Sequence, residues 1–439
     1  MTAFAAGTFD KLDILVIGLG ALGSIYSYLL EQSGKCRVTA LARSLYNVIS
    51  EKGITIHSQK FGLIEGYKPY RVFKTSQEAT DRNYSYILVC TKNLREFSDT
   101  TTLLEPFVNQ SSADQPVIVL IQDGIGIERG VRAAYPEAII CSAIAWIGAN
   151  LLSDGIVEHG LLERLELGVF TVERRQTLDE RTKRSESTQG KVAEARLASL
   201  AEMFKLGGSD VDVKEEIQVA RWQKNMWNAV IAIFCCLSAS PVSDVCSPAV
   251  LEYTLPAARR TMLELLYVAR ALGYDETILP AKIIDSMLKF TIKTWGSHER
   301  NVHQLLPPIP SHSQHQYESA STEGLQTIGV NYQPSMLIDL QKGRPTELET
   351  TLGSVLDHAR WTGTDTPRLD LLYALMKVKQ ESAVLAEGAR LQIVQETNFQ
   401  LPTPLSEDAP AAQSDKVRGR PVSSQAYRDE DAGWPSVAF

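Results

Sequence analysis

Apolar residues follow one pattern in the first half of this chain and another pattern in the second half. In the first half they form short, continuous runs rich in β-branched residues, which are typical of buried parallel strands. The expected strands cover residues 14–17, 37–42, 86–90, 117–121, 138–147 and 209–213. Helix-like patterns stand between several of these runs, for example over residues 24–30 and 45–52. This alternation predicts an α/β domain built on a parallel sheet.

From residue 215 onward, apolar side chains recur at helical spacing instead of in runs. The expected helices cover residues 217–234, 257–272, 281–295, 347–359 and 369–385. The change of period therefore predicts a boundary near residue 213. We expect an α/β domain over residues 1–213, followed by an all-α domain over residues 214–399.

Three segments fit neither pattern. Residues 173–196 combine many charges with Ser, Thr and Gln, which predicts a solvated insertion whose end leads into a helix through Leu206. Residues 296–333 are rich in His, Ser, Pro and Gln, and predict a loop insertion. Residues 400–439 are rich in Pro, Ser and charge but poor in aliphatic residues, so a disordered tail is expected there.

A glycine motif follows the first expected strand directly and precedes a helix-like pattern, with the spacing G-x-G-x-x-G. In dinucleotide-binding loops the first glycine allows a tight turn, the second lets a pyrophosphate approach the backbone, and the third lets helix and strand pack closely. The free N–H groups at the start of the helix favour phosphate. We therefore expect a Rossmann-type dinucleotide-binding domain, with a purely structural turn as the alternative. The expected loop consists of Gly18, Leu19, Gly20, Ala21, Leu22 and Gly23.

The residue that follows the second expected strand helps to predict whether NAD or NADP binds. An acidic residue about 20 positions after the glycines binds the ribose 2′-OH of NAD, whereas an Arg suits the 2′-phosphate of NADP. Here that position, 20 residues after Gly23, is Arg43, and no acidic residue follows until Glu51. The sequence favours NADP(H) over NAD(H), and a solvated surface Arg is the alternative interpretation.

Polar side chains also follow two later strands. Lys92 comes shortly after residues 86–90, and the turn Gln122–Asp123–Gly124 comes directly after residues 117–121. Ligands of open α/β sheets bind beyond the carboxyl ends of the strands. Lys92 and the turn are therefore expected to face a cofactor or a substrate.

The helical half carries further polar residues. Lys224 and Asn228 are four residues apart, so they share one face of an otherwise apolar helix. A Lys can protonate a developing alkoxide and polarise a ketone, although periodicity alone favours a surface Lys whose stem lies along the protein. Ser335 and Glu347 flank a segment that, taken alone, is typical of a loop leading into a helix with acidic residues in its first turn.

Taken together, these motifs resemble the ketopantoate reductase family (2-dehydropantoate 2-reductases) over most of residues 12–385. The glycine loop, Lys92 and the turn at residues 122–124 are similar to the family's cofactor- and substrate-facing segments. Gly148–Ala149, followed by the His159 segment, is similar to its next loop. The more specific match is a Lys and an Asn four residues apart, combined with a Ser and a Glu twelve residues apart.

The resemblance implies that a 2-oxo group is reduced by NADPH, and 2-dehydropantoate, reduced to pantoate in pantothenate biosynthesis, is the leading substrate. Lys224 would supply the proton, Asn228 and Ser335 would hold the polar groups of the substrate, and Glu347 would orient the cofactor or Lys224. Lys224 and Glu347 would thus be the catalytic pair. The implied cofactor-binding residues are those of the glycine loop, with Arg43, Lys92, Asp123, Ala149 and Glu347.

Two residues depart from the family pattern. The family usually has Asn where this chain has Asp123, and a carboxylate only accepts hydrogen bonds and repels an anionic substrate. A second substrate-binding Asn is expected where this chain has Ala232. Two alternatives therefore stay open: a related NADPH-dependent reductase of a different carbonyl compound, or a non-catalytic NADP(H)-binding protein.

The composition of the chain limits the kinds of partner that we expect for it. The net charge of −8 argues against nucleic acid as a partner, and no apolar run is long enough to span a membrane. The N-terminal residues do not resemble a secretory signal, and the six cysteines are expected to be reduced and buried, so a cytoplasmic location is expected. The four histidines at 298, 303, 312 and 315 have irregular spacing, so we expect no metal site. A small carbonyl compound is the expected partner, and a homodimer is compatible with the resemblance.

Arg43→Ala tests the expected choice of cofactor. Because the guanidinium is expected to pair with the 2′-phosphate, the native protein should bind NADPH more tightly than NADH, and the variant should lose much of this preference. Titration of both proteins with both nucleotides measures the effect. Equal affinities of the native protein for NADPH and NADH would remove the argument.

Overall fold

The computed structural model of the 439-residue chain describes residues 11–109, 115–152, 155–172, 174–296 and 332–399. Nearly all of the expected loop insertion, with its four histidines, and the whole tail at 400–439 lie outside the described residues. Contacts group the chain into one compact unit up to Arg390 and a second unit from Leu391 onward. The sheet and the helices discussed below belong to the first unit, except for the end of α14 beyond Arg390. The expected boundary near residue 213, between β10 and α7, stays a prediction.

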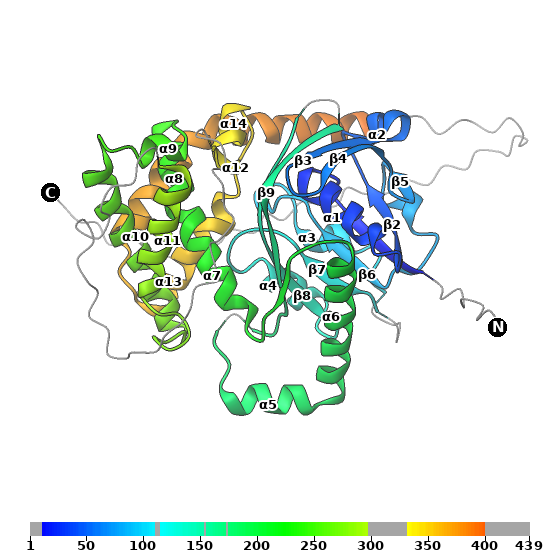
Figure 1. Cartoon of the computed structure of the whole chain (residues 1–439), viewed down its shortest axis with the longest axis horizontal. Helices are drawn as coiled ribbons and strands as arrows, with labels where there is room; N and C mark the ends of the chain where they lie inside the picture. Colours follow the sequence, from blue (N-terminus) through cyan, green and yellow to red (C-terminus); the bar gives the residue numbers. More distant parts are fainter. Residues whose placement is uncertain (1–10, 110–114, 153–154, 173, 297–331, 400–439) are drawn as a thin grey trace, which may run out of the picture. The chain divides into compact units, whose positions relative to one another are not determined.

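The first half forms a single sheet (Figure 1). Its described strands are β1 (Leu12–Ile17), β2 (Cys36–Leu41), β3 (Ile54–Ser58), β4 (Gly62–Tyr67), β5 (Arg71–Phe73), β6 (Tyr86–Val89), β7 (Val117–Leu120), β8 (Ile140–Leu151), β9 (Ile156–Val169) and β10 (Val211–Val213). Their order is β4-β3-β9-β8-β7-β6-β1-β2-β5, and β10 pairs with β9. The central strands β8, β7, β6, β1 and β2 run parallel. The segments that follow β1, β6 and β7 therefore leave the sheet at the same edge.

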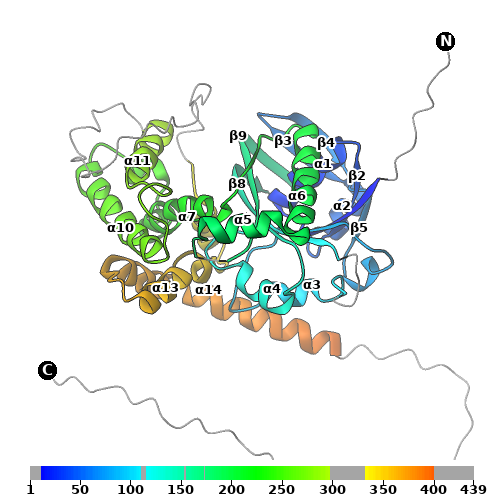
Figure 2. The same ribbon diagram turned by 90° about the horizontal axis from the view of Figure 1, so that it is seen from below.

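Helices cover both faces of this sheet, because side chains alternate along each buried strand. On β1, Ile14 and Val16 pack in one cluster with residues of α1 (Ala21–Gln32) and α6 (Thr188–Leu206). Leu15 and Ile17 pack in another cluster with residues of α3 (Thr100–Leu104) and α4 (Glu128–Ala134). Figure 2 shows α1 and α6 on one side of the sheet and α3 and α4 on the other. The short helices α2 (Tyr46–Lys52) and η1 (Gln77–Ala79) connect strands.

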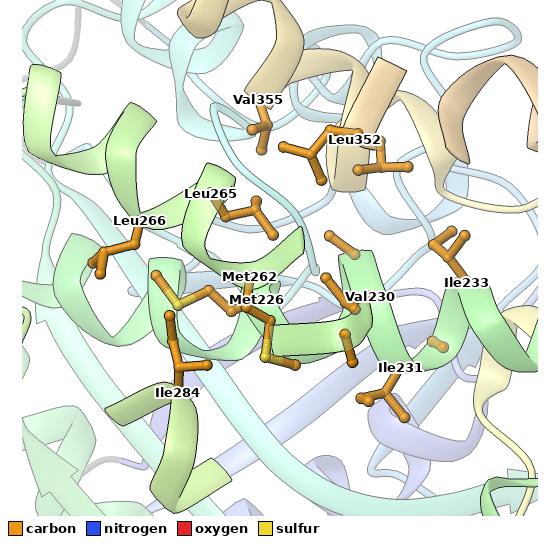
Figure 3. Close-up of a cluster of buried hydrophobic side chains, with 14 of the residues drawn as sticks. Met226, Val230, Ile231, Ile233, Met262, Leu265, Leu266, Ile284, Leu352 and Val355 are labelled. Carbon is orange, nitrogen blue, oxygen red and sulfur yellow. The ribbon is translucent and has the colours of Figure 1, made fainter. Parts of the chain in front are cut away.

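The second half is helical, which together with the sheet confirms the expected fold class. Its elements are α7 (Ile217–Trp227), η3 (Asn228–Ala232), α8 (Ile233–Ser238), α9 (Val242–Val245), α10 (Leu251–Ala271), α11 (Lys282–Trp295), α12 (Ser335–Gln341), η5 (Glu349–Gly353), α13 (Ser354–Thr362) and α14 (Pro367–Phe399). Their apolar faces meet in one core, where Met226, Met262, Leu265, Ile284 and Leu352 are buried together (Figure 3).

Three expectations need correction. Gly148 and Ala149 do not stand in a loop, because β8 continues to Leu151 and pairs with β9 across a register shift between Ile147 and Ala149. Such a bulge lets a strand continue while one residue leaves the ladder. The helix expected over residues 347–359 is a π-helical turn, η5, followed by α13.

The charged segment after residue 173 is helical. It holds α5 (Leu178–Glu186) in addition to α6, which ends at Leu206 as expected. A capping box starts α5, because the hydroxyl of Thr177 accepts from the N–H of Glu180 and the carboxylate of Glu180 accepts from the N–H of Thr177. Local capping thus gives a regular start to a helix that buries few apolar side chains.

Among the described helices, none combines the length and apolar composition that crossing a bilayer requires. The six cysteines at 36, 90, 141, 235, 236 and 246 are all free thiols. In the described part of the chain, no three His, Cys, Asp or Glu side chains gather as they do around a metal ion.

Candidate active site

The glycine loop after β1 has the geometry that its motif predicts. Gly18 has φ +95°, and a Cβ there would lie 2.6 Å from Thr91 Cγ2, which follows β6. A Cβ at Gly23 would lie 2.0 Å from the carbonyl oxygen of Gly18, so only glycine lets α1 pack this closely. At Gly20, by contrast, a Cβ would meet no atom within 4 Å. The backbone at Gly20 is therefore open to a ligand, and no side chain caps the N-terminus of α1.

Arg43 follows β2, the strand next to β1 in the sheet. Its side chain is exposed and forms no ion pair with another described residue. Ala149 lies farther away in sheet order, on β8, where it pairs with His159 of β9. The structure therefore leaves Arg43 available to an anion and gives Ala149 a position on a strand.

Two side chains from the helical half meet the segment after β6. Lys92 forms an ion pair with Asp339 of α12, whose carboxylate is 4% exposed. The next residue, Asn93, donates its backbone N–H to Glu347 Oε1 at 2.8 Å. Residues separated by about 250 positions are thereby joined at the edge of the sheet.

The central contact of the site joins the turn after β7 to helix α7. Lys224 Nζ lies 2.7 Å from Asp123 Oδ1 and donates to the carbonyl oxygen of Ala145 on β8 at 2.6 Å. Asn228 Nδ2 donates to Asp123 Oδ2 at 3.2 Å. One carboxylate thus binds both of the polar residues expected on this helix face. The ammonium of Lys224 is held at the sheet edge with only 16% of the side chain exposed.

A second ion pair, which is almost fully buried, holds the same turn and the same helix. Arg221, one turn before Lys224, donates to the carbonyl oxygens of Gln122 and Gly124, at 2.8 and 3.0 Å, which flank Asp123. Its Nε lies 3.0 Å from Glu128 Oε1, and both side chains are almost fully buried, at 1% and 0% exposed. The guanidinium therefore fixes the turn and the helix relative to each other.

Two π-helical turns lie against each other and against the same turn of the sheet. These are η3, which begins at Asn228, and η5, whose residue Thr350 accepts the N–H of Ile125 at 2.7 Å. A Cβ at Gly124, which has φ +101°, would lie 2.4 Å from Thr350 Cβ. Single π-turns within helices are frequent at functional sites. Here the two π-turns bring two helices close to the end of β7. The approach is so close that only glycine fits at position 124.

Glu347 lies just before η5 and keeps only partial exposure to solvent. Burial raises the pKa of its carboxyl to about 7, and the negative charge of Asp123 acts in the same direction. The hydrogen bond from Asn93 and the charge of Lys92 lower this pKa by smaller amounts. The carboxyl of Glu347 therefore keeps its proton to a higher pH than an ordinary glutamate does, because its pKa is raised.

The structure does not bring every predicted residue into this cluster. Ser335 is the exposed first residue of α12, and its hydroxyl forms no hydrogen bond with another described residue. Ala232 is 1% exposed and belongs to the helical core, so it offers no polar group. In the cluster that does form, Asp123, Lys224 and Asn228 contact one another. Lys92 and Glu347 are held beside the segment after β6, where the charges of Asp123 and Lys92 act on Glu347.

Two residues of the site were not expected from the sequence. Asp339 stands one helical turn after Ser335, and this spacing is the signal that points to it. Arg221 stands one turn before Lys224, at helical spacing with the apolar residues of its helix, and a charge at such a position indicates a buried partner.

Comparison with known proteins shows the family of this chain. The family model described as "Ketopantoate reductase PanE/ApbA" matches residues 14–171, and its C-terminal counterpart matches residues 216–380. This chain belongs to the ketopantoate reductase family. A relative named 2-dehydropantoate 2-reductase from Nostoc sp. is 20% identical over 362 residues, covering 82% of this chain and 93% of the relative.

Solved structures of the ketopantoate reductase family share the fold. The structure of 2-dehydropantoate 2-reductase from Methylococcus capsulatus is 29% identical with a TM-score of 0.63, covering 85% of this chain and 98% of that one. A ternary structure of D-mandelate dehydrogenase with NADH and anilino(oxo)acetate has the same TM-score of 0.63 at 18% identity, over 85% of this chain and 99% of that one. At this identity the second likeness concerns the fold alone.

Glu347→Gln tests the titration of this carboxyl. Because its folded pKa, about 7, lies above the usual 4.5, the folded protein holds the proton more tightly than the unfolded chain. This stabilisation is complete below the unfolded pKa and is lost as the pH rises through the folded pKa. Between these two pKa values the native protein should lose on the order of 3 kcal/mol more than the variant, which cannot titrate. Urea unfolding across this pH range measures the difference, and parallel curves would contradict it.

Proposed function

We propose that this protein reduces a carbonyl group to an alcohol with NADPH, and that Lys224 is the acid that protonates the carbonyl oxygen. The observation that carries the proposal is the ammonium of Lys224, held at the carboxyl edge of the sheet by Asp123 and the carbonyl oxygen of Ala145. Membership of the ketopantoate reductase family supports an oxidoreductase with this type of chemistry. The first candidate substrate is the 2-oxo acid 2-dehydropantoate, which would place the protein in pantothenate biosynthesis.

The residues at the sheet edge suit a dinucleotide. The backbone at Gly20 is open, and the N-terminus of α1 lacks a side-chain cap, so free N–H groups can bind a pyrophosphate. The exposed guanidinium of Arg43 suits a 2′-phosphate. When bound, NADPH supplies the hydride. We assign its binding to the glycine loop, Arg43, Lys92, Asp123, Ala149 and Glu347.

In this proposal Lys224 stabilises negative charge as it develops on the carbonyl oxygen and then transfers a proton to it. Asn228 and Ser335 bind polar groups of the substrate. Asn228 is already oriented by its hydrogen bond to Asp123, at 3.2 Å. Glu347, which accepts the backbone N–H of Asn93 at 2.8 Å, orients the cofactor or Lys224.

A specific observation favours a second candidate substrate. Ala232, at which a substrate-binding Asn was expected, is buried in the helical core and forms no polar contact. A substrate with fewer polar groups than 2-dehydropantoate would fit this site better, and a different carbonyl compound is therefore the second candidate. A protein that binds NADP(H) without catalysis is the third, and the cytoplasmic location and a homodimer stay predictions.

Lys224→Ala tests the proposed acid. Removal of a general acid costs roughly 10²- to 10⁴-fold in rate. We therefore expect kcat to fall by this order, while the affinity for NADPH changes little. Oxidation of NADPH followed by absorbance, with 2-dehydropantoate and a panel of ketones, measures the rate, and fluorescence titration measures the affinity.

Lys293→Ala is the matched control, because Lys293 is an exposed lysine of α11 outside this cluster. If Lys224→Ala keeps its kcat, the assigned proton donor is wrong. If the native protein binds NADPH but reduces none of the carbonyl compounds, the third candidate replaces the first two.

A further inference from the structure

The carboxylate of Asp123 is shared by the two groups that the proposed mechanism places around the substrate. Oδ1 lies 2.7 Å from Lys224 Nζ, and Oδ2 accepts from Asn228 Nδ2 at 3.2 Å. Its side chain is still 31% exposed, so it is not enclosed by these partners. A molecule that reaches Lys224 therefore meets a negative charge beside the ammonium.

Other cations of the described residues also lie against carboxylates. Within the described residues, Lys92 pairs with Asp339, and Arg344 lies 3.3 Å from the same carboxylate. The buried Arg221 pairs with Glu128. Lys92 and Arg344 share the one carboxylate of Asp339, whereas Arg221 and Lys224 each have a carboxylate of their own. At Lys224 itself the ammonium is therefore already paired, and a substrate carboxylate placed there would compete with Asp123.

The charge of Asp123 also acts on two other acidic groups of this region. Burial is the main cause that raises the pKa of Glu347 to about 7, and the charge of Asp123 is the next cause. Burial likewise raises the pKa of Tyr332 to about 12, again with Asp123 as the next cause. In both cases the surroundings disfavour a further negative charge. A second carboxylate brought into this region is subject to the same repulsion.

We propose that Asp123 is the specificity-determining residue of this site, and that it selects substrates in which the group next to the reacting carbonyl is uncharged. The substrate class is a 2-oxo ester, 2-oxo amide or lactone, or a simple ketone, rather than a free 2-oxo acid. This inference rests on the proposed function, which places the carbonyl group of the substrate at Lys224. Of the candidate substrates named there, it favours the second, a carbonyl compound other than 2-dehydropantoate. An uncharged ester oxygen accepts a hydrogen bond from Lys224 or Asn228 without repelling Asp123.

A matched pair of substrates tests the selection. The acid 3,3-dimethyl-2-oxobutanoate and its methyl ester have the same carbon skeleton around the ketone and differ in charge. We expect the native protein with NADPH to have a kcat/KM at least about tenfold higher for the ester than for the acid. In Asp123→Asn, which keeps the shape of the side chain, this ratio should fall about tenfold or more, mainly through a gain with the acid. A native preference for the acid, or an unchanged ratio in the variant, would overturn the inference.

Asp357→Asn is the control for net charge, because it removes the same charge from an exposed residue of α13 and should leave the ratio unchanged. A second measurement does not depend on turnover or on the folding of a variant. Binding of the acid and of the ester to the native protein with NADP⁺ is followed by tryptophan fluorescence, and the ester should bind more tightly. If neither compound is reduced, the proposed function fails for this pair of substrates. The relative affinity of the protein for acid and ester then decides the inference alone, and tighter binding of the acid refutes it.

Discussion

The buried ion pair between Arg221 and Glu128 is the constraint on which the site depends. Both side chains are almost completely buried, and removal of one partner from such a pair typically costs about 3–5 kcal/mol. The same guanidinium binds the carbonyl oxygens on both sides of Asp123, while its own helix carries Lys224 one turn later. A strand end of the sheet and a helix of the second half are thereby fixed in one geometry. The short contact between Asp123 and Lys224 follows from this geometry and does not have to hold the two halves together by itself.

Charges at this edge of the sheet occur in pairs that join the two halves of the chain. Asp123 and Lys224 form one such pair, and Lys92 and Asp339 form another. Glu347 accepts the backbone N–H of Asn93, and its partial burial together with the charge of Asp123 raises the pKa of its carboxyl to about 7. The ammonium that we assign as the acid is thus preorganised, which lowers the cost of stabilising charge during a reaction. In our proposal the same pairing also disfavours a charged substrate, so that catalysis and specificity depend on one arrangement.

The sequence predicts the local features of this protein well and the contacts between distant segments poorly. The strands near residues 14–17 and 117–121 and the glycine loop were predictable, because hydrophobic period and glycine spacing are local properties. The turns η3 and η5 were not, because a single π-turn interrupts a helical period without changing its composition. Both side chains of the Asp123–Lys224 pair were expected to face a ligand, but their direct contact spans about 100 residues of sequence. The continuation of β8 past Gly148 depends on pairing with β9, which no local pattern encodes.

Chemical rescue of Lys224→Ala tests the central claim, that this ammonium donates a proton to a carbonyl oxygen, most directly. The variant is assayed with NADPH and the best carbonyl substrate in the presence of ethylamine or propylamine, and separately with tetramethylammonium, a cation that has no proton to give. The account predicts that the primary amines restore part of kcat in a saturable manner and that tetramethylammonium does not. Equal restoration by tetramethylammonium, or no restoration by any amine in a variant that folds and binds NADPH, would contradict it.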